Sequence, residues 1–129
     1  MNPADVVARR LEAQQLSTHR FARPAELVAW FGAVQAQDYT SARWAVGQRL
    51  RAATDADVER ACDAGALIRT HVLRPTWHLV AAADVRWMLA LTAPRIKAAA
   101  ASTLRAAGLD ARFLARGHRV IEFVIKYYF

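Results

Sequence analysis

The sequence predicts a mainly α-helical fold with one short β-hairpin: a winged helix-turn-helix followed by the helices of an incomplete second unit. Apolar residues recur at helical spacing as far as Gly65. The pattern then changes to alternation in "ALIRTHVL" and "TWHLV", which is typical of two paired strands, and helical spacing returns after Asp84. Helices followed by a hairpin are the element order of a winged helix. A helical bundle with an incidental hairpin is the alternative.

The first two helices are indicated by apolar stripes. Residues 4–15 read as an amphipathic helix with Val7 and Leu11 on one face. Pro24 suits the first turn of a second helix, whose buried stripe repeats at helical spacing through Leu27, Trp30, Phe31 and Val34.

A third helix is expected over residues 41–51, where Thr40 or Ser41 can cap its start. We take it as the recognition helix, with Arg43 and Arg49 free to lie off its apolar face. Thr54 or Asp55 then caps a short fourth helix that stops at Gly65.

The hairpin covers residues 66–80, with "LRPT" at the tip of the wing. Asp84 begins a further helix, Pro94 begins another, and "GLD" ends that one and caps a last helix. We therefore divide the chain into a winged helix-turn-helix domain, residues 1–81, and a helical segment, residues 82–129, which starts a second unit and ends in the apolar tail "RVIEFVIKYYF".

The charge balance favours a polyanionic partner. The chain has 18 basic and 11 acidic residues, a formal charge of +7, and this field attracts nucleic acid at low salt. Double-stranded DNA is the expected partner, although a GC-rich genome would also enrich arginine. The candidate DNA-contacting residues lie on the third helix and the hairpin: Arg43, Arg49, Arg69, His71 and Arg74.

Several classes of protein are not indicated. The single Cys62 excludes an internal disulfide and a multi-cysteine zinc site, and the histidines lack partners at a ligand spacing, so we expect no metal and no cofactor. No leader and no membrane-length apolar run is evident, so a cytoplasmic protein is expected. The apolar tail favours self-association.

The run "QAQD" at residues 35–38 raises a geometric question. Helical residues two apart point about 200° away from each other, so Gln35 and Gln37 can face one ligand only if the helix ends near Val34. Amides orient a ligand but take no proton at neutral pH, and Asp38 is the adjacent proton acceptor. The alternative is turn chemistry: one glutamine caps backbone groups, the other is solvated, and Asp38 caps the next helix.

The runs "LVAWFGAVQAQDYTSARWAVGQRL" and "GALIRTHVLRPTWHLVAAADVRWMLALTAPR" resemble the winged-helix DNA glycosylases of the AlkZ type, over roughly residues 4–115. That family removes alkylated or crosslinked bases and is built from tandem winged-helix units around a positively charged DNA channel. It carries a catalytic glutamine–aliphatic–glutamine motif, which Gln35, Ala36 and Gln37 match. The resemblance implies that Gln35 and Gln37 are catalytic.

Neutral amides suit this chemistry. An N7-alkylated purine already carries positive charge, so its glycosidic bond breaks without an acid, and the enzyme has to place a water at the sugar carbon. Members of the family are several hundred residues long, so we expect a truncated glycosylase acting in base excision repair. A non-catalytic winged-helix DNA-binding regulator and an inactive remnant are the alternatives.

Overall fold

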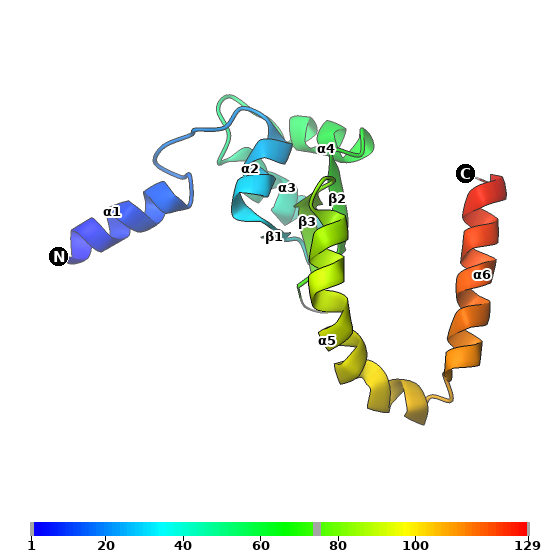
Figure 1. The fold of residues 1–129 in the computed structure, drawn as a ribbon. Coiled ribbons are helices and arrows are strands. Elements are labelled where there is room, and N and C mark those ends of the chain that lie inside the picture. Colours follow the sequence, from blue (N-terminus) through cyan, green and yellow to red (C-terminus); the bar gives the residue numbers. More distant parts are fainter. Residues whose placement is uncertain (1, 74–75, 129) are drawn as a thin grey trace. The chain divides into compact units, whose positions relative to one another are not determined.

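The computed structural model describes residues 2–73 and 76–128. The chain forms two compact units, Met1–Ala93 and Pro94–Phe129, which we describe separately. The predicted fold class is confirmed, because the chain is mainly helical with a small antiparallel sheet in a winged-helix-like order (Figure 1). The first unit contains α1 (Pro3–Ala13), α2 (Pro24–Phe31), β1 (Val34–Gln35), α3 (Tyr39–Gly47), α4 (Asp55–Asp63), β2 (Leu67–His71) and β3 (Trp77–Ala81).

The first helix, α1, buries none of its residues, and the apolar side chains of Val7 and Leu11 are exposed. It begins at a capping box formed by Asn2 and Asp5. After its end the side chain of Gln15 is fully buried. That side chain donates to the Glu12 carbonyl and accepts from the Arg20 main-chain N–H, so its polar atoms are satisfied.

The second helix, α2, ends at Phe31, earlier than the predicted stripe through Val34. Gly32 follows with a φ of 80°, a left-handed conformation that glycine adopts without steric cost. The chain therefore leaves the helix axis, and Val34 and Gln35 become a strand instead of another helical turn.

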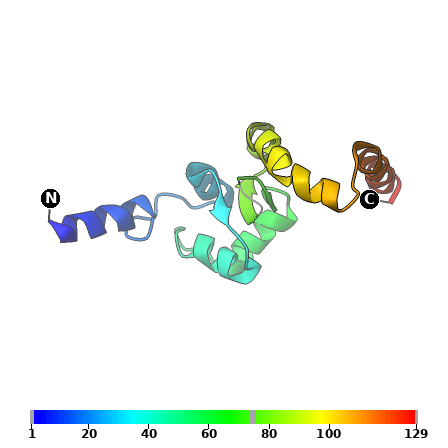
Figure 2. The ribbon, with the colours of Figure 1, turned by 90° about the horizontal axis from the view of Figure 1, so that it is seen from below.

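The sheet has the order β1-β3-β2, and both strand pairs are antiparallel. The predicted hairpin is confirmed, with Leu67 opposite Ala81 and His71 opposite Trp77. The strand β1 was not predicted; it adds to the free edge of β3, with Gln35 opposite His78. Figure 2 shows β1 beside the hairpin from below.

The strand β3 is covered on both faces, because adjacent residues of a strand point to opposite sides of a sheet. Leu79 packs in the core formed with α2, α3 and α4, and Val80 packs with Val72 and Met88 in a second cluster. The main core consists of Leu27, Val28, Ala36, Ala42, Val46, Leu50, Val58, Leu67 and Leu79.

Side-chain caps set the starts of α3 and α4. The expectation that Thr40 or Ser41 caps α3 is wrong: the Asp38 carboxylate accepts from the Ser41 N–H at 2.7 Å, so α3 begins at Tyr39, and it ends at Gly47 instead of residue 51. The predicted cap at Thr54 is confirmed and forms a capping box with Asp57.

The helix α5 (Val85–Ala106) runs without interruption through Pro94, so the prediction of a new helix at that residue is wrong. Proline removes one helical hydrogen bond, but the alanine-rich sequence on its C-terminal side has high helix propensity. The boundary between the two units falls at this proline. In the first unit, the Thr92 hydroxyl donates to the Val72 carbonyl and so connects α5 to the end of β2.

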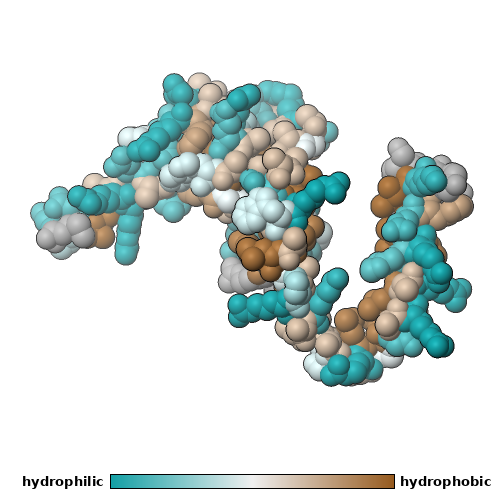
Figure 3. All heavy atoms as spheres, viewed as in Figure 1, coloured by the Kyte–Doolittle hydropathy of each residue, from teal (hydrophilic) through white to brown (hydrophobic). Residues whose placement is uncertain are grey.

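The second unit holds the C-terminal part of α5 and the predicted last helix, α6 (Ala111–Tyr128), capped by Asp110. Figure 3 shows apolar side chains along one edge of α6 and polar ones along the other. Its exposed apolar residues include Phe113, Val120, Ile121 and Ile125. Among the helices of the described ranges, none is long and apolar enough to cross a membrane.

Candidate functional site

The two glutamines lie on a short extended segment between α2 and α3. Gln35 pairs with His78 in the sheet, and the Ala36 N–H donates to the Trp77 carbonyl at 2.7 Å. Ala36 is fully buried in the core, while Gln35 and Gln37 are exposed. This alternation is that of a strand, so the two amide side chains leave the chain on the same side.

Gln35 and Gln37 line one surface depression of about 270 Å³. Its other lining residues are Asp38, Ser41, Ala42 and Ala45. Gln35 also borders a neighbouring depression of about 280 Å³, which Arg49 lines as well. The geometric condition set by the sequence is met, because α2 ends before Gln35 and both residues line the same depression. The contacts of the turn-chemistry alternative are present as well: Asp38 caps α3, Gln37 accepts from a main-chain N–H, and Gln35 is exposed.

The chain around Gln37 is held by Arg69 from β2. The Arg69 Nε donates to the Ala36 carbonyl at 3.0 Å and Nη2 donates to the Gln37 carbonyl at 3.1 Å. The Gln37 side chain is held as well, because its Oε1 accepts from the Trp77 main-chain N–H at 3.4 Å. Contacts from both strands of the hairpin thus fix the position of Gln37.

Arg69 belongs to a stack of aromatic and cationic side chains. Its guanidinium carbon lies 4.5 Å from the ring centroid of Trp77 and 5.7 Å from that of Tyr39. The guanidinium carbon of Arg43 lies 5.0 Å from the centroid of the same Tyr39 ring, and His71 contacts Trp77 with ring centroids 4.1 Å apart and ring planes tilted by 44°. These contacts restrict the position of the Arg69 guanidinium.

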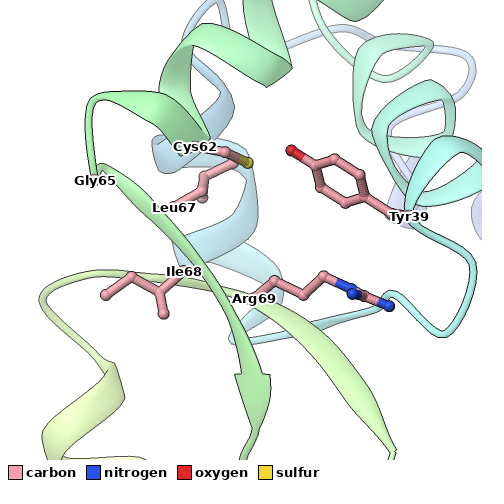
Figure 4. A pocket seen from close by; sticks show the side chains of 6 residues that line it. All are labelled: Tyr39, Cys62, Gly65, Leu67, Ile68 and Arg69. Carbon is pink, nitrogen blue, oxygen red and sulfur yellow. The ribbon is translucent and has the colours of Figure 1, made fainter.

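A pocket of about 430 Å³ lies beside this stack, lined by Tyr39, Cys62, Gly65, Leu67, Ile68 and Arg69 (Figure 4). The figure shows the Tyr39 hydroxyl and the Cys62 sulfur pointing toward each other. Their hydrogen bond, followed by burial, raises the pKa of Tyr39 to about 12. The Tyr39 ring itself contacts the guanidinium groups of both Arg43 and Arg69.

Arg43 on α3 and Arg49 just after this helix, both predicted to contact DNA, have partners within the protein. The side chain of Arg43 is only 13% exposed and forms ion pairs with Asp55 at 3.2 Å and Glu59 at 2.5 Å. Arg49, whose pKa is lowered by burial, donates to the carbonyls of Gln14 and Ala45. The sequence indicated only that these side chains lie off the apolar face, and it does not show which acceptors surround a basic residue.

The hairpin residues have different surroundings. His71 is exposed apart from its stacking on Trp77, and Arg74 lies outside the described residues. His78 is buried, with its Nδ1 2.8 Å from the Thr76 carbonyl oxygen, and it lies opposite Thr70 of β2 in the register. In the described ranges, no group of three histidine, cysteine or carboxylate residues could hold a metal ion.

The position of β1 changes the assignment of the recognition helix. In the element order of a winged helix, α3 and α4 are the two consecutive helices before the hairpin, so α4 and not residues 41–51 is the candidate for the recognition position. The charge of α4 is −3, from four acidic residues and Arg60. Its acidic residues are Asp55, Asp57, Glu59 and Asp63. A helix of this charge repels the phosphates that line a DNA groove.

Two parts of the site were missed in the sequence. The alternation of Val34, Gln35, Ala36 and Gln37 before a capping Asp38 is a strand signal that could have indicated β1. The contacts of Arg69 with main-chain carbonyls have no such signal, since every residue carries a carbonyl.

Comparison with known proteins identifies the family. The sequence model of the AlkZ-like family, described as "DNA glycosylase AlkZ-like", matches residues 28–122, which include both glutamines, the whole sheet and α5. No curated protein and no solved structure gave a match to this chain. The family match covers most of the chain and agrees with the resemblance carried by "QAQD". The chain belongs to the AlkZ-like DNA glycosylase family.

Proposed function

We propose that this chain takes part in the removal of alkylated or crosslinked bases from DNA, with Gln35 and Gln37 positioning the attacking water. The observation that carries the proposal is that both amides border one depression on a segment fixed at each end. The strand pairing of Gln35 fixes its start, and the cap formed by Asp38 fixes its end. A catalytic group that acts by orienting water must itself be held in a fixed position, and this segment is held in that way.

The groups at the depression suit the departure of a base that is already cationic. A carboxamide can accept a hydrogen bond from water and donate another, so two of them can hold a water at the sugar carbon as the glycosidic bond breaks. Hydrogen bonds from Ser41 lower the pKa of Asp38, which keeps this carboxylate ionised at neutral pH. Asp38 lines the same depression and is the adjacent proton acceptor, but its lowered pKa makes it a weaker base than an ordinary carboxylate.

The DNA would lie against the side of the unit that carries the glutamines and the wing. His71 on the hairpin is a candidate phosphate contact there, and Arg74, outside the described residues, stays a candidate from the sequence. A contact by Arg49 would compete with its hydrogen bonds to the carbonyls of Gln14 and Ala45. A contact by Arg43 would require its two ion pairs to break. The acidic surface of α4 argues against a regulator that reads a groove with this helix.

The DNA-binding part of the proposal is tested by measuring the affinity of the 129-residue chain for two duplexes of unrelated sequence at several salt concentrations. We expect equal affinities for the two duplexes, because phosphate contacts do not depend on sequence. The logarithm of the binding constant should fall by about 0.9 per phosphate contact for each tenfold increase in salt. Absence of binding would contradict the proposal. A preference for one sequence of about 1000-fold would favour the regulator.

A further inference from the structure

We propose that Arg69 is a positioning residue for the glutamine pair and not a phosphate contact. The inference deepens the proposed function and rests on it for its catalytic meaning. The hydrogen bonds of Arg69 on which it is based are present in the protein without DNA and can be tested there. Arg69 was a candidate DNA contact by its charge, but the guanidinium is directed at the protein's own main chain.

The two carbonyls that Arg69 binds flank a single residue. The Ala36 carbonyl belongs to the peptide group before Gln37, and the Gln37 carbonyl belongs to the peptide group after it. Holding both peptide groups restricts both backbone dihedrals of Gln37. The Trp77 N–H, which binds the Gln37 side-chain oxygen, then restricts the carboxamide itself.

Gln37 needs this support more than Gln35 does. Gln35 belongs to β1 and pairs with His78, whereas β1 ends at Gln35 and α3 begins at Tyr39. Gln37 lies in the gap between these elements, where neither a strand ladder nor a helix holds it. Arg69 supplies the missing main-chain partners from a neighbouring strand.

Arginine suits this role because its guanidinium is planar and presents Nε and one Nη as a fork along one edge. The contact with Trp77, whose ring centroid lies 4.5 Å from the guanidinium carbon, helps to hold the fork in place. A lysine has one ammonium on a flexible stem and cannot reproduce two parallel hydrogen bonds. Arg69→Lys therefore keeps the charge while removing the fork, which separates positioning from phosphate binding.

The expected consequence follows from the chemistry of the amides. A glutamine that holds a water contributes only through its orientation, and a misplacement of about 1 Å can cost about 100-fold in rate. Loss of the fork should therefore reduce catalysis while leaving DNA affinity nearly unchanged.

The test uses NMR of the full chain in the wild-type, Arg69→Lys and Arg86→Lys forms; Arg86 is an exposed arginine on α5 and serves as the matched control. In the wild type we expect a through-hydrogen-bond coupling between Arg69 Nε and the Ala36 carbonyl carbon. We also expect the Arg69 Nε–H to exchange with water at least about tenfold more slowly than that of Arg86. This measurement needs no variant, so a misfolded mutant would not prevent it.

In Arg69→Lys we expect the side-chain amide signals of Gln37 to shift and its backbone order parameter to fall below about 0.6, with Gln35 less affected and Arg86→Lys unchanged. An unprotected Arg69 Nε–H in the wild type would overturn the proposal. So would unchanged Gln37 signals in Arg69→Lys.

The salt dependence of DNA affinity distinguishes a failure of the positioning role of Arg69 from a failure of the proposed function. If Arg69 contacted a phosphate, Arg69→Gln would lower the salt slope by about one unit, which would also overturn the positioning role. We expect the slope of Arg69→Gln to match that of the wild type. If the wild type bound no DNA while the Arg69 fork was observed, the proposed function would fail and the positioning of Gln37 would stand.

Discussion

Gln35 and Gln37 line the same depression, although only Ala36 separates them and a helix would place them on nearly opposite faces. The extended backbone makes this possible, because Ala36 points into the core and is fully buried. The burial of a small apolar residue thus sets the direction of both amides. The left-handed conformation of Gly32 ends α2 before Gln35, and this allows Gln35 and Gln37 to face the same depression.

Gly32→Ala should destabilise the first unit. The φ of 80° at this position is strained for any residue with a Cβ, so we expect a loss of about 1–2 kcal/mol in the free energy of unfolding. Gly117→Ala is the matched control: Gly117 lies within α6 with no neighbouring atom within 4 Å of an added Cβ, so its replacement should not destabilise the chain. Urea unfolding of both variants measures the difference, and an equal response at the two positions would contradict this account of α2 termination.

The helices of the first unit and the hairpin could be predicted from the sequence because each carries its own periodic signal. The stripe of α2, the cap at Thr54 and the alternation around Leu67 all depend on residues close together in the chain. The strand β1 could not be identified in this way. It is two residues long and exists because β3, about forty residues later, supplies its hydrogen-bond partners.

The same limit applies to the site. The family resemblance identified the glutamines, but the surroundings of the basic residues followed from tertiary contacts. Arg43 and Arg69 look alike in the sequence, yet one binds two carboxylates and the other binds two carbonyls. Charge predicts a partner of opposite sign without indicating whether that partner lies inside the protein.

The start of α3 should be sensitive to acid. The pKa of Asp38 is lowered in the folded chain by hydrogen bonds from Ser41, so its stabilising contribution is present above the unfolded pKa, about 3.9, and is lost as the pH falls through the folded pKa. We expect the Ser41 amide signal to shift in this pH range as the cap weakens. Asp38→Asn keeps a capping oxygen without a titrating group, so its Ser41 signal should stay constant. An identical acid transition in both proteins would assign it to another group.

Arg43→Ala should affect folding more than DNA binding. The arginine lies between Asp55 and Glu59, and its removal leaves these two α4 carboxylates without their partner. Because both carboxylates are about half exposed, we expect a loss of about 1 kcal/mol in unfolding free energy and an unchanged salt slope of DNA affinity. Arg86→Ala, at an exposed position, should leave stability within about 0.5 kcal/mol of the wild type. A salt slope lowered by about one unit in Arg43→Ala would show that Arg43 contacts a phosphate after all.

The most direct measurement of the central claim is base release in a single turnover, with residues 28–122 of this chain replacing the matching segment of a longer AlkZ-like glycosylase. A duplex containing N7-methylguanine is the substrate, and DNA affinity is measured in parallel. We expect Gln35→Ala and Gln37→Ala each to reduce the rate of base release by about 10- to 1000-fold while DNA affinity stays nearly constant, because positioning groups act in the transition state. Base release by the Gln35→Ala/Gln37→Ala double variant at the unsubstituted rate would contradict the claim and would assign the glutamines to the structure of the turn.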